Sequence, residues 1–506
     1  MSTAPALDQL AALSHRLEKV SSLLDVSKVL AAERDLDTLL PVILIEAAHT
    51  VEAERCTLFI LDREKGELVS KVAQGAEAEL RMDASQGVAG AVVETGVPLN
   101  LPDAYSDPRF NASFDQQLGF RTRQLLCVPM MDRNGEVVGV IQALNRRTDT
   151  PFTAEDEELL LALGSQAAGA IENAFLHEDI NNLFEGFVSA SVVAIESRDP
   201  STAGHSGRVA DLSVTLAQAL ENAPGGVYAA TRFSRAELRE LRYASLLHDF
   251  GKVGVREPVL VKAEKLYPEE LEVLKSRFQL ARMDLQLQSY RRRLALARRE
   301  GTDALDRHEP GEEARLTAEL AALDEKLAFI LACNRPTVLA QGGFEQLTEL
   351  AHHTFCDSHG HSHPLLTERD VKLLSIPRGT LSVEERREIE SHVTHTYRFL
   401  RQIPWTRNLK GVPEIAYAHH EKLDGSGYPR ALSAPAIPVQ SKIMAISDIY
   451  DALTAADRPY KKAVPHALAL DILEQEVQRN AVDGELLRIF IEAEIPRRAL
   501  NLRSGG

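Results

Sequence analysis

His419-His-Glu-Lys-Leu-Asp-Gly-Ser-Gly-Tyr-Pro429 is the most informative stretch of this chain, because two adjacent imidazoles lead into a glycine-rich loop. Other imidazoles and carboxylates stand in short strings elsewhere in the same half: Gly204-His-Ser-Gly-Arg-Val209, His248-Asp-Phe-Gly-Lys252, His392 and Ser447-Asp-Ile-Tyr-Asp451. Neutral imidazole nitrogens together with carboxylate oxygens suit borderline divalent metals such as iron, manganese, cobalt, nickel or zinc. The strings therefore predict a transition-metal site in the C-terminal half.

One pair of adjacent residues would allow the site to hold two metals. Asp249 directly follows His248, and the two oxygens of such a carboxylate can bridge two ions. A pair of ions about 4 Å apart hydrolyses phosphodiesters by generating hydroxide at neutral pH and neutralising the phosphoryl oxygens. A single histidine on a helix is more often a packed or surface residue, so the prediction depends on all the strings occurring together.

Residues 199–470 resemble the HD-GYP family of cyclic dinucleotide phosphodiesterases, a branch of the HD metal hydrolases. The resemblance is carried by Asp199-Pro, Thr202-Ala-Gly-His205 with Arg208-Val209, His248-Asp249 with Lys252, His392, His419-His420, Asp424-Gly with Gly427-Tyr428-Pro429, and Asp448-Ile-Tyr-Asp451 through Arg458-Pro-Tyr460. It implies an all-α HD-type metal hydrolase domain, which we place at residues 199–500.

The resemblance also implies roles for individual residues. The implied metal ligands are His205, His248, Asp249, His392, His419, His420 and Asp448, holding two divalent ions, with iron or manganese expected first. Asp249 would bridge the ions and Lys252 would assist catalysis. Lys252 and Arg458 would hold phosphate, and the Gly427-Tyr428-Pro429 loop would contact substrate or a partner, unless it only closes the fold. Arg208 lies one turn after His205 and fits either a substrate contact or an ion pair.

Three departures from the family pattern stand out. Ser201 occupies the position where some members carry a Glu for a third metal, so a dinuclear site is expected. Thr396 replaces a Gly four residues after His392, a change that a helix tolerates. Residues 270–370 form an insertion larger than the usual connection.

The implied reaction is hydrolysis of cyclic di-GMP to pGpG, with GMP as a further product. Three alternatives stay open from the sequence. The substrate could be 3′,3′-cyclic GMP-AMP, since no motif reads the second base. The domain could be a catalytically weak receptor for a cyclic dinucleotide or for a diguanylate cyclase, although the complete ligand set argues against it. A nucleoside polyphosphate substrate is disfavoured by the Gly-Tyr-Pro loop.

The N-terminal half has a different sequence pattern. Apolar, β-branched runs at residues 56–61, 125–130 and 137–144 are separated by turns such as Asp132-Arg-Asn-Gly135, which predicts an α+β domain on an antiparallel sheet with flanking helices. Residues 22–175 resemble a GAF sensor domain. The resemblance is carried by Asn145, Arg146, Phe152, Asp156 and Glu157, a signature that we interpret as structural, with a cyclic nucleotide or another small molecule as a possible ligand of the domain.

Helical patterns connect and extend these domains. An amphipathic helix is predicted near the N-terminus, within residues 1–35, and a connecting helix at 154–198; together they suggest a parallel homodimer. Residues 269–335 predict two helices with a turn between Gly301 and Gly311. Leu266-Tyr-Pro-Glu-Glu270 recurs 115 positions later as Leu381-Ser-Val-Glu-Glu385, with Arg277 in the first copy where His392 stands in the second.

Composition limits the remaining possibilities. The 506 residues suffice for several domains, and a formal charge of −17 disfavours nucleic acid and anionic membranes as partners. Four cysteines without metal-type spacing, and no evident membrane span, predict a cytoplasmic protein. A histidine-rich stretch at 352–363 is interpreted as a solvated loop rather than a metal site.

Overall fold

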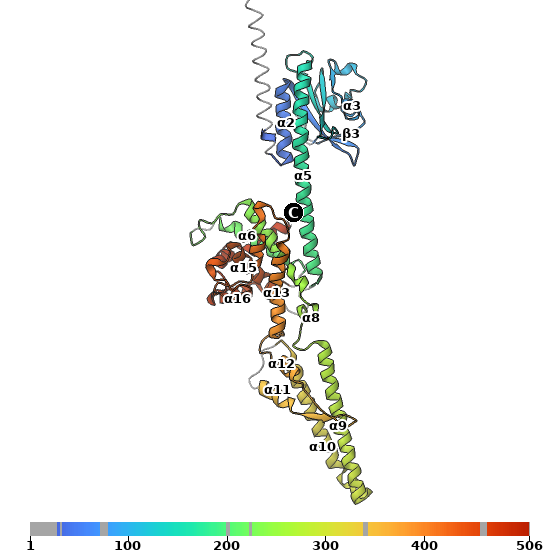
Figure 1. Cartoon of the computed structure of the whole chain (residues 1–506), viewed down its shortest axis with the longest axis vertical. Coiled ribbons are helices and arrows are strands. Elements are labelled where there is room, and N and C mark those ends of the chain that lie inside the picture. The colour runs from blue at the N-terminus through green and yellow to red at the C-terminus, as the bar shows by residue number, and fades with distance from the viewer. Residues whose placement is uncertain are drawn as a thin grey trace, which may run out of the picture. The chain divides into compact units, whose positions relative to one another are not determined.

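The computed structural model describes residues 28–30, 33–70, 79–198, 203–221, 225–336, 343–455 and 463–504. The chain divides between Gly186 and Phe187 into two compact units (Figure 1). The predicted helix within 1–35 falls almost entirely outside the described residues, as do Asp199, Ser201, Thr202, Arg458 and Tyr460.

The N-terminal unit is built on a six-stranded antiparallel sheet in the order β3-β2-β1-β6-β5-β4. The strands are β1 (Ala53–Asp62), β2 (Glu67–Ser70), β3 (Leu80–Asp83), β4 (Leu99–Leu101), β5 (Leu125–Met131) and β6 (Val137–Arg146). The three predicted runs form β1, β5 and β6, the centre of the sheet. This confirms the predicted α+β domain.

Side chains along β1 point alternately to the two faces of the sheet, and the core of this unit accordingly has two layers. Cys56 and Leu58 face α2 (Leu36–Thr50) and the first part of α5 (Ala154–Arg198). Phe59 faces the opposite side, where α3 (Gly87–Thr95) packs, and α4 (Ser113–Leu118) and the short η1 (Ala104–Ser106) complete the unit. Each face of the sheet is therefore covered by helix, as Figure 1 shows for α2, α5 and α3.

The C-terminal unit is largely helical, as predicted. Outside the insertion it contains α6 (His205–Leu220), α7 (Arg235–Leu247), η3 (Phe250–Gly254), α8 (Glu257–Leu260), α13 (Val383–Leu400), η4 (Arg407–Leu409), α14 (Val412–Tyr417), η5 (Ala434–Ala436), α15 (Val439–Thr454), α16 (His466–Gln478), α17 (Gly484–Glu492) and α18 (Ile495–Ser504). Helices α6, α7, α13, α14 and α15 carry or adjoin the predicted ligands.

The insertion has its own apolar core, formed by residues such as Phe278, Ile330 and Leu374. Its elements are α9 (Pro268–Glu300), α10 (Thr302–Asn334), α11 (Gly343–Ala351), β7 (Thr354–Cys356), β8 (Ser362–Pro364) and α12 (Glu368–Leu374). Two expectations were wrong in detail. The turn between the long helices is Gly301 alone, because α10 begins at Thr302 and continues through Pro310, and a two-stranded sheet interrupts the all-helical pattern.

The two repeated segments are both helix starts, and they touch. Tyr267 precedes α9 and Ser382 precedes α13, and the backbone amide of each donates to the Glu three residues later. Only Ser382 completes a capping box with its side chain. The Tyr267 hydroxyl donates to Glu385 Oε1 at 2.6 Å, and Lys262 Nζ lies 2.7 Å from the same oxygen. Because Lys262 and Glu385 are buried, this cluster fixes the base of the insertion against helix α13.

Helix α5 is an exception to the expected absence of membrane-spanning stretches. It is long and apolar enough to cross a membrane by length and composition, but half of its most apolar window is buried inside the structure. In the N-terminal unit Leu160 and Leu163 belong to the sheet core. In the C-terminal unit Val188 and Ile195 are buried. Such burial is what the core helix of a protein shows.

Candidate metal centre

The structure brings all seven predicted ligands to one place from five separate segments. His205 is the first residue of α6, His248 and Asp249 join α7 to η3, His392 lies within α13, His419 and His420 follow α14, and Asp448 lies within α15. Five of them are at most 4% exposed, and the Asp448 side chain is 13% exposed. Because buried polar groups are costly unless they are used, this convergence is itself a sign of function.

Each of four imidazoles is fixed by a hydrogen bond through its Nδ1 atom. His248, His392 and His419 pair with the carbonyl oxygens of Ser245, Ile389 and Ala416 at 2.7, 2.6 and 2.6 Å. The fourth, His205, pairs with Asp451 Oδ2 at 2.7 Å. Such a bond at one ring nitrogen sets the tautomer and directs Nε2 into the centre, which is the usual orientation of a metal-binding histidine.

The ligands form two groups joined by Asp249. His205, His248 and Asp249 can each place one ligand atom within 4.8 Å of the others, and the same holds for His392, His419 and His420. Asp249 Oδ2 lies 3.4 Å from His248 Nε2, whereas Asp249 Oδ1 lies 3.3 Å from His392 Nε2. One oxygen of Asp249 therefore faces each group, as a bridging carboxylate requires.

The side chains fit a pair of divalent metal ions. His392 Nε2 and His419 Nε2 are buried without any hydrogen-bond partner, and burial lowers the pKa of both imidazoles. Burial also lowers the pKa of His420 to about 4. These three rings are consequently neutral at physiological pH, which is the form that binds a metal.

The opposite group is held by carboxylates. Burial alone would lower the pKa of His205, but hydrogen bonds to Asp448 and Asp451 raise it to about 9. Although burial acts against it, the pKa of Asp249 lies well below its usual value because of Lys252 and the surrounding imidazoles. Asp448 Oδ1 lies 3.1 Å from His205 Nε2. The group thus offers ionised oxygens, and a metal bound at His205 Nε2 would replace the proton that these oxygens stabilise on the ring.

Of the three predicted cations, Lys252 and Arg208 lie among the described residues, and they have different partners. Lys252 Nζ lies 2.7 Å from Asp249 Oδ2, at the edge of the centre. Arg208 instead binds Asp451, with Nε 2.6 Å from Oδ1 and Nη2 3.1 Å from Oδ2. Of the two roles that the sequence left open for Arg208, the structure shows the ion pair, and that pair holds the carboxylate that orients His205.

The Gly427-Tyr428-Pro429 loop borders the second group. The Tyr428 ring lies 4.8 Å from the ring of His420, centroid to centroid, and the Tyr428 amide donates to the His420 carbonyl oxygen at 3.2 Å. A side chain at Gly427 would overlap the backbone of Glu421 and Lys422, so only glycine fits. The loop therefore places an aromatic face next to the ligands.

Sequence reasoning missed two supporting residues. Asp451 was quoted within a motif but given no role. Thr396 was expected to be merely tolerated, yet its hydroxyl accepts from the Gly251 amide at 2.8 Å and donates to the His248 carbonyl oxygen at 2.9 Å. A side chain on Gly251 would overlap the carbonyl oxygen of His392. Helix α13 and the His248-Asp249 turn are thus packed backbone to backbone, which the spacing of motifs does not reveal.

Residues of the GAF signature bond and pack within their own domain. Asn145 is fully buried, donates to Glu54 and to the Arg121 carbonyl oxygen at 2.9 Å each, and accepts from the Arg123 amide at 2.6 Å. Arg146 lies 3.6 Å from Asp156. Phe152 is buried, and Glu157 belongs to the first turn of α5.

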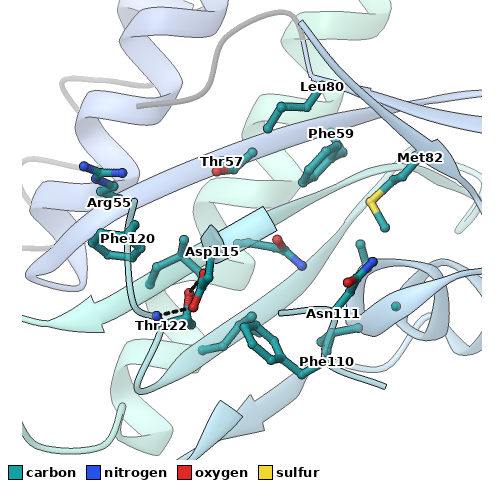
Figure 2. Close-up of a pocket in the computed structure, with 16 residues that line it drawn as sticks. Arg55, Thr57, Phe59, Leu80, Met82, Phe110, Asn111, Asp115, Phe120 and Thr122 are labelled. Carbon is teal, nitrogen blue, oxygen red and sulfur yellow. Dashed lines mark hydrogen bonds between the residues drawn. The ribbon is translucent and has the colours of Figure 1, made fainter. Parts of the chain in front are cut away.

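A cavity of about 90 Å³ lies on the α3 side of the sheet, lined by side chains that include Thr57, Phe59, Phe110 and Asp115 (Figure 2). The Thr122 amide and hydroxyl donate to Asp115 at 2.6 and 2.7 Å. Ligand pockets usually measure roughly 300–1,000 Å³, so a nucleotide would need the cavity to widen. None of the five signature residues is among the residues that line it.

The histidine-rich stretch forms the exposed β7-β8 hairpin. Asp357 Oδ2 lies 3.1 Å from both His361 Nδ1 and His363 Nε2, and the His361 side chain is 73% exposed. Neither of the two groups of candidate ligands found among the described residues lies in this stretch, so its interpretation as a solvated surface stays a prediction.

Comparisons with known proteins agree with this two-domain organisation. A model described as the GAF domain matches residues 35–171, and a model described as the HD domain matches residues 370–486. The chain therefore has a GAF domain followed by an HD domain. The HD match begins after most of the insertion and covers His392, His419, His420 and Asp448, whereas His205, His248 and Asp249 join them only in the fold.

One curated relative is a dual 3′,5′-cyclic-AMP and -GMP phosphodiesterase 11A from Takifugu rubripes, 33% identical over 189 residues. That match covers 32% of this chain and 21% of the relative, so the chain spans about a fifth of the relative's length. Among solved structures, the GAF domain of a phosphoenolpyruvate-protein phosphotransferase from Coxiella burnetii is 24% identical, covering 32% of this chain and 98% of that one with a TM-score of 0.30. A free methionine-R-sulfoxide reductase from Neisseria meningitidis is 21% identical, with coverages of 31% and 89% and a TM-score of 0.27.

Proposed function

We propose that this protein is a metal-dependent phosphodiesterase that hydrolyses cyclic di-GMP to pGpG, with GMP as a further product, under the control of its GAF domain. The observation that supports it most is the pair of ligand groups sharing Asp249, because one carboxylate oxygen faces each group. The resemblance of residues 199–470 to the HD-GYP family suggests a cyclic dinucleotide as the substrate, and the HD match supports a metal-dependent hydrolase domain.

Two bound divalent ions would activate water and neutralise charge on the phosphoryl oxygens. The chain's own residues supply the rest. Lys252 is held by Asp249 at the edge of the centre, where an ammonium group can bind a phosphate oxygen. Tyr428 offers an aromatic face beside His420 for a base or ribose. Asp451 keeps the Nε2 atom of His205 directed inward.

Turnover of purified protein tests this proposal. Anaerobically purified chain, analysed for iron and manganese, is assayed with cyclic di-GMP, 3′,3′-cyclic GMP-AMP, cyclic AMP and cyclic GMP, and products are resolved by chromatography. We expect two metals per chain and fastest turnover of cyclic di-GMP. Preference for 3′,3′-cyclic GMP-AMP would support the alternative dinucleotide substrate, and preference for cyclic AMP or cyclic GMP would overturn the dinucleotide assignment.

A receptor role is the competing proposal from a different class. A chain that binds a cyclic dinucleotide or a diguanylate cyclase without hydrolysis would need no bridging ligand, so the complete ligand set favours the enzyme. Metal-replete protein that binds cyclic di-GMP in titration calorimetry but releases no linear product over hours would decide for the receptor.

Regulation and assembly form a separate part of the proposal. Helix α5 leaves Leu176, Ile180, Leu183 and Phe187 at least 46% exposed with alternating spacings of four and three, as a coiled-coil seam requires. We therefore expect a parallel homodimer through α5, with the GAF domain altering turnover. Deleting residues 1–175 should change turnover per catalytic domain and weaken association; unchanged kinetics and an unchanged mass would refute this part alone.

A further inference from the structure

Helix α9 of the insertion carries apolar residues on two opposite sides. On one side Leu274, Phe278 and Ala281 are buried in the core that α9 shares with α10. On the other side stand six exposed large apolar residues: Val273, Leu280, Met283, Leu287, Tyr290 and Leu294, with exposed fractions of 58, 46, 63, 41, 66 and 52%. Successive residues turn by about 100°, so Leu280 lies roughly 200° around the helix from Phe278.

The exposed residues, called here the α9 stripe, follow a heptad. Val273, Leu280, Leu287 and Leu294 are seven apart, and Met283 and Tyr290 each lie three positions after a member of that series. This is the a and d pattern of a helix that packs against another helix. Helix α10 is equally long, yet within its described residues 302–334 it has no exposed large hydrophobic side chain. The stripe is therefore specific to α9 and is not a general property of the hairpin.

Charges at the ends of the stripe identify its occupant. Glu269 and Glu272 are exposed near the N-terminal end, whereas Arg291 and Arg298 are exposed near the C-terminal end. A second α9 running antiparallel about a two-fold axis near Met283 would place Val273 beside Leu294, Leu280 beside Leu287, and Glu269 beside Arg298 of the other copy. A parallel copy would instead bring like charges together. A two-fold contact is self-complementary in this way.

We propose that the α9 stripe is a homotypic interface, on which a second copy of this chain docks antiparallel through its own α9. The surface lies in the insertion and is separate from the seam on α5, so it holds whether or not the proposed catalytic function does. Six half-exposed apolar side chains per helix give a contact at the small end of specific interfaces, on the order of 1,000 Å². We therefore expect association in the micromolar range.

Sedimentation of the full chain tests the interface. The double substitution Leu280→Glu and Leu287→Glu would bury charge in the α9 stripe. It should abolish the association through α9, so that a smaller oligomer sediments, and raise the dissociation constant at least about tenfold. Phe344→Glu, at an exposed position of α11 in the same insertion, is the matched control and should sediment as the unaltered chain does. Identical sedimentation of the double variant and the unaltered chain would overturn the proposal.

Charge reversal and cross-linking test the orientation. Glu269→Arg and Arg298→Glu should each weaken association, and their combination should restore it. In a Cys356→Ser background, a mixture of Val273→Cys and Leu294→Cys chains should form a disulfide between copies. Val273→Cys alone should not, because 21 residues of helix separate its two copies by about 31 Å. Cross-linking of Val273→Cys alone would show a parallel pair and overturn the arrangement. Failure of every pair to cross-link would overturn the interface.

Discussion

The two repeated helix starts, at α9 and α13, use the same local design for different purposes. At both starts the amide of the residue before the helix donates to the Glu three residues later, and ten residues after that cap position stand Arg277 in α9 and His392 in α13. Arg277 Nη2 lies 2.8 Å from Asp370, and Nη1 donates to the Leu365 carbonyl oxygen at 3.1 Å, although Nε has no partner. His392 Nε2 has no hydrogen-bond partner and points into the cluster of ligands.

This difference separates a residue whose charge is paired within the insertion from one that we propose binds a metal. The charge of Arg277 is neutralised by a carboxylate of the same insertion, so the side chain contributes to folding. The free nitrogen of His392 is a cost to the fold that a bound metal would repay, since a buried polar atom without a partner destabilises by about 1–3 kcal/mol. Equivalent positions in one chain thus allow the two roles to be compared directly.

The largest expected effect comes from removing the residue that joins the two ligand groups. Asp249→Ala should lower turnover by about a thousandfold or more, because the bridging oxygens and the partner of Lys252 are both lost. The helical fold should persist, which circular dichroism checks. A folded, metal-replete variant with near-normal turnover would contradict the assignment of the centre.

The comparison of Arg277 with His392 predicts opposite effects of their substitution on stability and on turnover. His392→Ala should lose one metal and at least about a hundredfold in turnover, while the metal-free protein loses less than about 2 kcal/mol of stability. Metal analysis and thermal unfolding of chelated protein measure both. Normal metal content in His392→Ala would break the comparison.

Arg277→Met should have the opposite effect to His392→Ala, lowering stability and leaving turnover unchanged. It leaves Asp370, which is buried, without its countercharge, so the insertion should be destabilised by about 3–5 kcal/mol. Turnover of the remaining folded protein should be unchanged. Urea unfolding monitored by far-ultraviolet circular dichroism gives the stability. A large loss of turnover in a fully folded variant would mean that Arg277 has a catalytic role.

The sequence predicts the candidate metal ligands better than it predicts the residues that hold those ligands in place. The sheet, the helical half and the convergence of the seven candidate ligands could be predicted because imidazoles, carboxylates and apolar runs have recognisable spacings. The role of Asp451 was not, because it depends on α15 packing beside α6 so that one carboxylate reaches both His205 and Arg208. The continuation of α10 through Pro310 was also missed, because a proline normally predicts a break.

The next largest effect on metal affinity and turnover is expected from substitution of Asp451. Asp451→Asn retains the shape but weakens the hold on His205 Nδ1, so metal affinity and turnover should fall about 10- to 100-fold. Excess metal should restore much of the turnover if Asp451 acts only through His205, and metal titration against turnover measures this. Turnover lost with unchanged metal affinity would show that Asp451 acts in some other way.

The smallest effect is expected at Thr396, where α13 meets the His248-Asp249 turn. Thr396→Val keeps the volume of the side chain but removes the hydroxyl that accepts from the Gly251 amide and donates to the His248 carbonyl oxygen. Because the site is fully buried, water cannot replace these bonds, and stability should fall by about 1–3 kcal/mol. The ligands themselves are untouched, so turnover should change only a few-fold. Thr396→Ser, which retains the hydroxyl, should lose less stability than Thr396→Val despite its smaller volume. If Ser proves the more damaging substitution, packing rather than hydrogen bonding positions the turn, and α13 would support the metal centre in the same apolar way that α9 supports the insertion.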